Sequence, residues 1–238
     1  MKYAALSTLV VLALAASGAS ASLGRAVSSG CPATLANRLA STRSATQLIT
    51  VVTRSRSATH GTLRLWRKSG DCWRDAGGPW WAWVGQRGVS TRKHEGDRTT
   101  PAGAFGFARV MYGIAPNPGV RYPYHRVVCG DWWVEDASWP SYNRFRHMPC
   151  GSKPPFKTTS EDLSRSTNAY RHFAVIAYNS NPIVPGRGSG IFLHASTGRP
   201  TLGCVSLSVA QLVRTLRWLR PTRSPVIVIG TGAQIRSF

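Results

Sequence analysis

Short apolar runs recur along the chain between residues that favour turns. The runs are rich in β-branched and aromatic side chains, and Gly and Pro stand between them. They occupy residues 48–53, 62–66, 80–84, 104–108, 132–135, 173–178, 191–194 and 226–229. Runs of this length and composition are typical of β-strands. Many short strands with little helix between them predict a mostly β domain of the sandwich or barrel type.

One segment follows helical spacing instead. Ser208 and Gln211 have the spacing of an N-terminal capping box, and Pro221 marks the end. Between them, apolar residues fall at helical spacing: Val209, Leu212, Val213, Leu216 and Leu219. We therefore predict one short helix in the C-terminal half. The stretch 113–168, crowded with Pro, Arg and aromatic residues, is predicted to be a long loop region.

The N-terminus has the pattern of an export signal. Lys2 precedes an apolar run over residues 4–16, and the small residues at 19–21 suit signal peptidase. We predict a signal peptide at 1–21, an exposed segment at 22–46 and one folded domain at 47–238. No later stretch is long and apolar enough to predict a membrane anchor. The expected location is outside the cytoplasm, in the cell wall or a periplasm-like space.

The charge balance is strongly basic. Lys and Arg number 30 against 9 Asp and Glu, for a formal net charge of +21. Such a surface attracts polyanions; once the family resemblance described below is taken into account, the expected partners are anionic cell-wall polymers. Nucleic acid is not expected, because the chain is predicted to be exported and has no recognised nucleic-acid motif. The Trp clusters at 80–83 and 132–139 could stack on sugar rings, although packing in the core or a lid is the favoured interpretation.

Five cysteines leave one unpaired if the others form disulfides in an oxidising compartment. Cys31, Cys72, Cys129 and Cys150 lie in polar surroundings suited to bridges, and they allow three pairings. Proximity along the chain favours Cys31 with Cys72 and Cys129 with Cys150, so Cys204 is the predicted free thiol. No pair has the spacing of a zinc site, and neither a metal nor an organic cofactor is predicted.

Cys204 follows His194 by ten positions, with Gly203 directly before it. A strand ending at His194 and a turn-rich return can bring the imidazole near the sulfur, which favours the nucleophilic thiolate. Gly203 lets the backbone turn sharply and present N–H groups toward an oxyanion. The alternative is structural, because a single Cys is often a small buried apolar residue and a single His often part of the core.

Two segments resemble the L,D-transpeptidase (YkuD-like) catalytic domain. Residues 194–207 (HASTGRPTLGCVSL) are similar to its His-Xaa-Xaa-Xaa-Gly segment followed by Ser/Thr-His-Gly-Cys-Val, and residues 96–105 (GDRTTPAGAF) to its Thr-Pro-Xaa-Gly-Xaa-Phe element. The resemblance implies a β-sandwich-like domain with a cleft. It also implies crosslinking of peptidoglycan stem peptides through a cysteine thioester.

Carried over by position, the resemblance makes Cys204 the nucleophile, His194 its base, and Gly203 and Cys204 the oxyanion donors. It implies that the substrate-binding residues are Thr201, Ser196, Thr197 and Gly198, with Thr201 in the place of the motif Ser/Thr. Two positions depart from the motif: Leu202 replaces the motif His, and Ser206 stands where Arg or Asn is usual.

Three activities remain open at the level of sequence. An amine from a second stem peptide would resolve the thioester in a transpeptidase, whereas water would do so in an L,D-carboxypeptidase. The third is a catalytically silent, basic cell-wall-binding module, which the Leu202 departure favours.

His94, Glu95 and Asp97, close to the upstream motif segment, invite a metal or acid-base interpretation, but their turn-rich surroundings favour an exposed loop.

Overall fold

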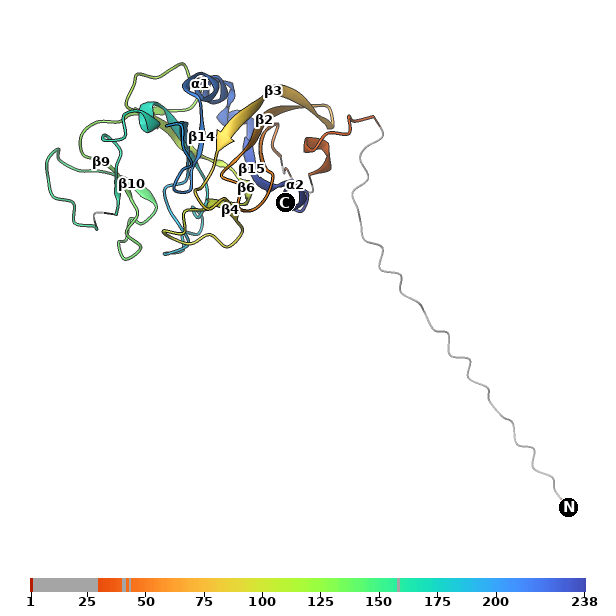
Figure 1. Cartoon of the computed structure of the whole chain (residues 1–238), viewed down its shortest axis with the longest axis horizontal. Helices are drawn as coiled ribbons and strands as arrows, with labels where there is room; N and C mark the ends of the chain where they lie inside the picture. The colour runs from red at the N-terminus through yellow and green to blue at the C-terminus, as the bar shows by residue number, and fades with distance from the viewer. Residues whose placement is uncertain (2–29, 40–41, 43, 158) are drawn as a thin grey trace.

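The computed structural model describes residues 1, 30–39, 42, 44–157 and 159–238, so the predicted signal peptide lies outside the described residues apart from Met1. The largest sheet has ten strands in the order β6-β15-β1-β2-β3-β14-β13-β12-β7-β8 and curls through the molecule (Figure 1). Its strands are β1 Gln47–Thr53, β2 His60–Ser69, β3 Cys72–Trp83, β6 Gly103–Phe105, β7 Phe107–Gly113, β8 Tyr124–Arg126, β12 Phe173–Ile176, β13 Phe192–Ala195, β14 Val205–Leu207 and β15 Val226–Thr231.

Smaller elements complete the domain. A three-stranded sheet has the order β10-β9-β11, and a two-stranded sheet pairs β4 with β5. Their strands are β4 Val89–Ser90, β5 Thr100–Pro101, β9 Asp131–Val134, β10 Arg144–His147 and β11 Glu161–Asp162. The helices are α1 Val209–Trp218 and α2 Gly232–Ile235, with 3-10 turns η1 Ala36–Arg38, η2 Ala169–Arg171 and η3 Pro221–Arg223.

The mostly β prediction is confirmed. Each predicted run contributes to a strand, and the run 104–108 is divided between β6 and β7 at Gly106. The helix after Ser208 is also confirmed, with the Ser208 hydroxyl accepting a hydrogen bond from the Gln211 N–H at 3.4 Å. Leu212 and Leu216 are buried on its inner face. The short helix α2 was not predicted.

Two predictions about irregular segments need correction. The stretch 113–168 is not one long loop, because β8, β9, β10 and β11 lie within it. Of these, β9 is the strand predicted by the run 132–135. The other three are only two to four residues long and partly charged, so the apolar pattern does not mark them. The described part of 22–46 is not exposed throughout, since Ala36, Leu39 and Ala45 are buried. They share a cluster with Leu48, Trp66, Trp73, Val228 and Ile235, which we call the N-terminal cluster.

Both predicted disulfides are present. Cys31 is bonded to Cys72, and Cys129 to Cys150. The first bridge ties the N-terminal segment to β3, and the second ties the segment before β9 to the segment after β10. Cys204 is free, as predicted. Two disulfides fit an extracellular location.

Strands β13 and β14 separate two layers of side chains, because successive residues of a strand point to opposite faces. Leu193 and Val205 belong to the main core, which also takes in the apolar side of α1. Phe192 packs on the other face in a second core. We call this second core the site cluster: Tyr112, Val127, Trp133, Leu163, Tyr170, Phe173, Val175 and Phe192, with Cys204 packed against it.

Candidate active site

The turn that carries Cys204 joins two parallel neighbours, β13 and β14. His194 pairs with Ser206 in this ladder, and Leu193 with Val205. A parallel pair needs a crossover connection, and residues 196–204 supply it. Since His194, Ser206 and Cys204 alternate with core-facing residues, all three side chains lie on the face that carries the site cluster.

Hydrogen bonds fix the backbone of this turn. The Thr201 N–H donates to Val84 O at 2.9 Å, and Thr201 O accepts from the Gln86 N–H at 2.8 Å. Cys204 O accepts from the Thr201 hydroxyl at 2.7 Å and from the Thr100 hydroxyl at 3.1 Å. Thr100 belongs to the upstream motif segment and Cys204 to the downstream one, so the structure brings the two segments together.

The Cys204 sulfur lies among main-chain groups of the preceding strand. It accepts a hydrogen bond from the Phe192 N–H at 3.3 Å and donates to Gly190 O at 3.2 Å. Burial raises the pKa of this thiol well above its usual value, and the nearby carboxyl groups of Glu161 and Glu135 raise it further. The Phe192 N–H and the charge of Lys93 act in the opposite direction. In this state the sulfur is therefore a protonated thiol.

His194 is held in one tautomer. Its Nδ1 lies 2.8 Å from Ala195 O, which can only accept a hydrogen bond, so Nδ1 carries the proton and Nε2 keeps its lone pair. Burial lowers the pKa of His194 to about 4, because desolvation disfavours the imidazolium. The ring lies edge-on to Tyr170, with centroids 5.8 Å apart. A neutral imidazole with a free Nε2 is the form that a general base needs.

The two predicted partners share a face but are not hydrogen-bonded to each other. Among the described residues, the sulfur bonds only to Phe192 and Gly190, and the imidazole only to Ala195. Between β13 and β3 lies Ser206, whose hydroxyl is buried and has no hydrogen-bond partner within the described chain. The Cys204–His194 pairing thus stays a prediction that requires the thiol to turn away from Gly190.

The structure changes the expectation for the oxyanion donors. The Gly203 N–H donates to the Thr201 hydroxyl at 3.1 Å and is therefore engaged inside the turn. The Cys204 N–H has no acceptor in the part of the chain that the structure describes. Of the two predicted donors, only Cys204 offers a free N–H in this state. Gly203 has φ +153°, a region that favours glycine, so its place in the motif has a conformational reason.

The other predicted substrate-binding residues lie at the surface end of the return. Thr197 and Gly198 are exposed, and Ser196 is half-buried with its hydroxyl accepting from the Gly198 N–H at 3.0 Å. Thr201 is buried, and its hydroxyl is used within the turn. Leu202, at the motif His position, is 68% exposed and carries no polar group toward the sulfur. Substrate binding by these residues stays a prediction.

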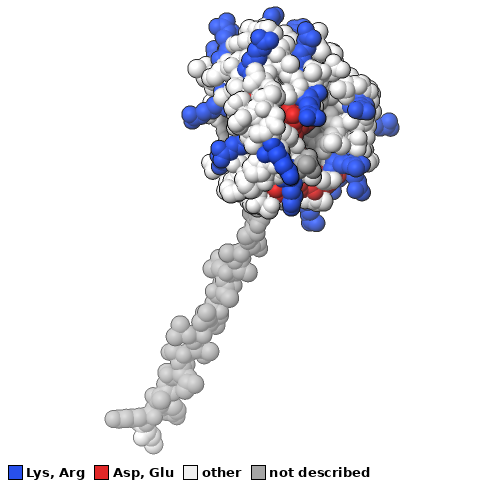
Figure 2. All heavy atoms as spheres, turned by 90° about the vertical axis from the view of Figure 1, so that its left-hand side faces the viewer, with Lys and Arg blue, Asp and Glu red and all other residues white. Residues whose placement is uncertain are grey.

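Sequence analysis missed the ionisable groups that surround the thiol. Glu135 follows β9, Glu161 begins β11, and Tyr170 lies in η2, all outside the two motif segments. Burial raises the pKa of Glu135 to about 8, and the charges of Glu161 and Glu95 add to this. Burial also raises the pKa values of Glu161 and Tyr170. Figure 2 shows how few acidic side chains accompany the many Lys and Arg on one face of this basic protein.

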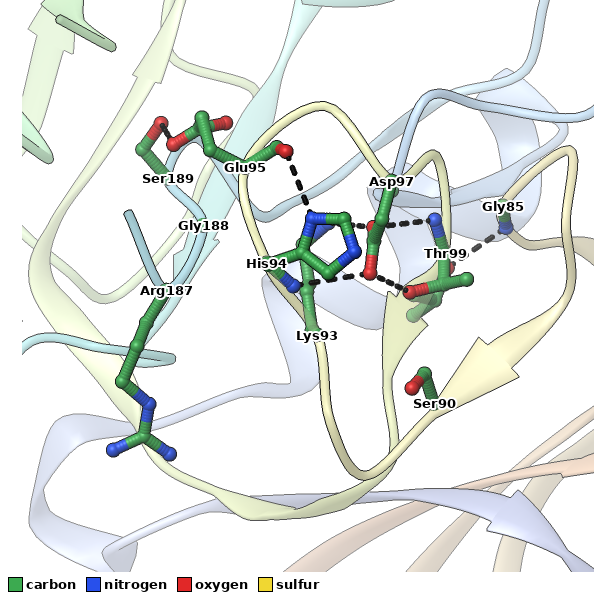
Figure 3. A network of polar contacts seen from close by, with 12 residues as sticks. Gly85, Ser90, Lys93, His94, Glu95, Asp97, Thr99, Arg187, Gly188 and Ser189 are labelled. Atoms are coloured by element: carbon green, nitrogen blue, oxygen red, sulfur yellow. Dashed lines mark hydrogen bonds and ion pairs between the residues drawn. The ribbon is translucent and has the colours of Figure 1, made fainter. Parts of the chain in front are cut away.

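The loop with His94, Glu95 and Asp97 is only partly exposed, which corrects the predicted exposed loop. His94 is exposed, whereas Asp97 is buried and bonded to Lys93 (Figure 3). Glu95 accepts from the Tyr142 hydroxyl and, at 2.7 Å, from the Ser189 hydroxyl. Four residues are not enough sequence to show which side of a loop packs inward, so the signal was absent.

Other features are reported for the described residues alone. No group of three or more His, Cys, Asp or Glu side chains there has the arrangement of a metal site, and no helix there is long and apolar enough to cross a membrane. Among the predicted Trp clusters, Trp133 is buried, whereas Trp81 is 54% exposed and stacks on His60 with ring centroids 3.8 Å apart. Two cavities, of 620 Å³ and 760 Å³, have no predicted site residue in their linings.

Comparison with known families gives one match. Residues 55–228, well over half of the chain, match the model of the L,D-transpeptidase catalytic domain. The match spans both motif segments and includes β13, β14 and α1. No curated protein and no solved structure matched the chain. The chain belongs to the L,D-transpeptidase catalytic domain family, and its function is of that type, with peptidoglycan as the substrate.

Proposed function

We propose that this protein is an exported L,D-transpeptidase that crosslinks peptidoglycan stem peptides through a thioester on Cys204. The observation that carries the proposal is a single free cysteine in the motif turn, on the same sheet face as a neutral His194 whose Nε2 is free to accept a proton. The family match supplies the substrate class.

The first half-reaction uses the two side chains in turn. The Cys204 thiol leaves Gly190 O and gives its proton to His194 Nε2, and the sulfur attacks the carbonyl carbon of the diamino acid in a donor stem. The imidazolium then protonates the departing amine of the terminal D-Ala as the carbon–nitrogen bond breaks. A thioester remains on Cys204, and His194 is neutral again. The free Cys204 N–H is the group positioned to stabilise the oxyanion.

The second half-reaction decides between transfer and hydrolysis. In a transpeptidase, the side-chain amine of an acceptor stem attacks the thioester carbon, His194 accepts the proton, and the thiol leaves the carbonyl. In an L,D-carboxypeptidase, water takes the place of the amine. We favour transfer, because a thioester reacts with amines in preference to water. The basic surface supports the further proposal that anionic wall polymers hold the protein near its substrate.

A carbapenem adduct tests the nucleophile. This class of β-lactam is expected to acylate the active cysteine of the family, so the mature protein should gain the mass of one carbapenem, and Cys204→Ala should gain none. Intact mass spectrometry gives the result. Ser206→Ala is a matched control, since it removes a nearby buried hydroxyl and keeps the thiol. An adduct that persists in Cys204→Ala, or no adduct at all in the folded wild-type protein, would contradict the proposal and favour the silent wall-binding module.

Product analysis tests the reaction type. Incubation with a tetrapeptide stem should release D-Ala and give crosslinked dimers in wild-type protein and neither product in Cys204→Ala. Separation by liquid chromatography with mass detection distinguishes a dimer from a shortened tripeptide. Tripeptide without dimer would replace the transpeptidase proposal with the carboxypeptidase.

A further inference from the structure

A buried ion pair lies against the turn that carries Cys204. Lys93 Nζ is 2.9 Å from Asp97 Oδ1, and the two side chains are only 3% and 8% exposed. Figure 3 shows both residues in one loop, with the carboxylate of Asp97 surrounded by hydrogen-bond donors. Taking two charges out of water is costly unless geometry and hydrogen bonds offset the lost solvation. A buried ion pair beside a predicted nucleophile therefore calls for a functional explanation.

Asp97 is fixed by the loop's own backbone. Its carboxylate accepts from the His94 N–H at 3.0 Å, from the Thr99 N–H at 2.9 Å and from the Thr99 hydroxyl at 2.8 Å. Burial alone would raise the pKa of Asp97, but the hydrogen bonds from Thr99, Lys93 and His94 together lower it. The carboxylate is therefore a fixed anion that holds the Lys93 ammonium in one place.

Two glycines make room for Lys93. A Cβ on Gly188 would lie 2.9 Å from Lys93 Cε, and a Cβ on Gly203 would lie 3.3 Å from Lys93 Nζ. The aliphatic stem thus packs on Gly188, while the ammonium rests against the residue directly before Cys204. Both glycines have positive φ, +104° and +153°. A side chain at either position would press on the lysine.

The Lys93 ammonium has unused hydrogen-bond donors. An ammonium carries three N–H groups, and within the described chain Lys93 Nζ has one hydrogen bond, to Asp97. The ammonium lies against the Gly203 turn, where a Cβ would be 3.3 Å from Nζ. A cation beside the turn that carries a buried thiol favours the thiolate over the thiol, and the charge of Lys93 acts to lower the pKa of Cys204.

We infer that Lys93, oriented by Asp97, is a positioning residue of this site, and that its ammonium acts through the Gly203 turn to favour the thiolate of Cys204. This inference deepens the proposed function by naming the charge that activates the same nucleophile, at a place in the chain outside both motif segments. Burial and the carboxyl groups of Glu161 and Glu135 oppose it at the sulfur.

Alkylation of the thiol tests this inference without any substrate. Four of the five cysteines are in disulfides, so the rate of iodoacetamide labelling reports Cys204 alone. Labelling rates over a range of pH follow the thiolate fraction and so report shifts in the apparent pKa of the thiol, because only the thiolate reacts. Lys93→Met keeps the stem and removes the charge. We expect it to raise the apparent pKa by about one unit and to slow labelling below that pKa about tenfold.

Three further variants make the test specific. Lys93→Arg keeps the charge and should retain more than half of the shift that Lys93→Met loses. Asp97→Asn keeps the Lys93 charge but removes the anion that holds it in place, so it should raise the apparent pKa of Cys204 by less than Lys93→Met does. Lys68→Met is the matched control, because Lys68 lies on β2 with its ammonium over the Trp73 ring. It should leave the pH profile of Cys204 labelling unchanged. Circular dichroism and thermal melts establish that each variant is folded.

The outcomes separate the inference from a structural role. An unchanged pH profile in folded Lys93→Met would overturn it. A shift in Lys93→Arg as large as that in Lys93→Met would also overturn it, because it would indicate general disturbance of the turn instead of a loss of charge. If Lys93→Met does not fold, Asp97→Asn decides, and labelling no slower than in the wild-type protein overturns the inference. Carbapenem acylation is scored separately, so a silent enzyme with a Lys93-dependent thiol would refute the proposed function alone.

Discussion

The N-terminal cluster and the site cluster are both buried, aromatic and adjacent to cysteine, yet they differ in chemistry. In the N-terminal cluster, the nearby cysteines are locked in a disulfide and the Trp66 ring N–H donates to the Thr50 hydroxyl at 2.9 Å. In the site cluster, the cysteine is free, and Tyr170 lies among buried groups that ordinarily ionise. The first region gains stability from apolar burial, and the second holds His194 and Glu135 in neutral forms at a cost that depends on pH.

The largest expected effect is in the N-terminal cluster. Trp73→Ala removes a buried side chain, 4% exposed, and should lower the free energy of unfolding by about 4 kcal/mol. Urea denaturation measures the loss. Trp81→Ala is the matched control, because Trp81 is 54% exposed and should cost less than about 1 kcal/mol. If folded Trp73→Ala changes the alkylation rate of Cys204, the N-terminal cluster and the site cluster are not independent, and the contrast between them fails.

The next effect concerns His194. Because its pKa is lowered to about 4 from an ordinary value of 6.5, the unfolded chain binds a proton that the folded one does not, and stability falls as pH drops from 6.5 through 4. This loss should be about 3 kcal/mol in the wild-type protein. His194→Gln should lose correspondingly less between pH 7 and pH 4. Urea denaturation at both pH values provides the measurement, and an equal loss in the variant would mean that the imidazole is not buried in its neutral form.

A smaller effect of opposite direction is expected for Glu135. Its pKa is raised from 4.5 to about 8, so the folded state keeps a proton that the unfolded state loses, and stability falls as pH rises from 4.5 through 8. Glu135 is half-buried, and partial contact with water reduces the effect to about 2 kcal/mol. Glu135→Gln should therefore raise the melting temperature at pH 8 and leave it nearly unchanged at pH 4. A rise of the same size at both pH values would point to packing instead of ionisation.

The smallest effect is expected where an ion pair is exposed. Arg64 and Asp75 are 2.9 Å apart on β2 and β3, with side chains 39% and 48% exposed. Asp75→Asn should change the free energy of unfolding by less than about 0.5 kcal/mol, because water and salt screen such pairs. Denaturation at low and high salt checks this value. A loss of unfolding free energy above about 2 kcal/mol would contradict the view that the exposed Arg64–Asp75 pair matters less than the buried Lys93–Asp97 pair.

The part of the molecule that sequence analysis predicts well is the part that local patterns determine. The helix after Ser208 follows from its cap and apolar spacing, and the pairing of Cys31 with Cys72 from proximity along the chain. The strands need only composition and turn residues. The motif around Cys204 is also a local sequence pattern, which is why the family could be recognised from two short segments.

The part that could not be predicted depends on partners far away in the chain. Lys93 is buried because Gly188 and Gly203 leave space for it, and no pattern around residue 93 records those glycines. Glu135 ends a predicted strand, where a carboxylate ordinarily faces water. Its burial against Gly190 depends on a segment that follows more than fifty positions later. The engagement of the Gly203 N–H by Thr201 likewise needs the turn geometry.

The main-chain bonds that tie Thr201 to Val84 and Gln86 have a consequence for recognition. The backbone around the sulfur is already ordered before any ligand arrives, so little conformational entropy remains to be lost on association. If the proposed function holds, a donor peptide must adapt its own shape to that fixed surface. Selectivity would then reside in how readily each candidate strand adopts the required curve.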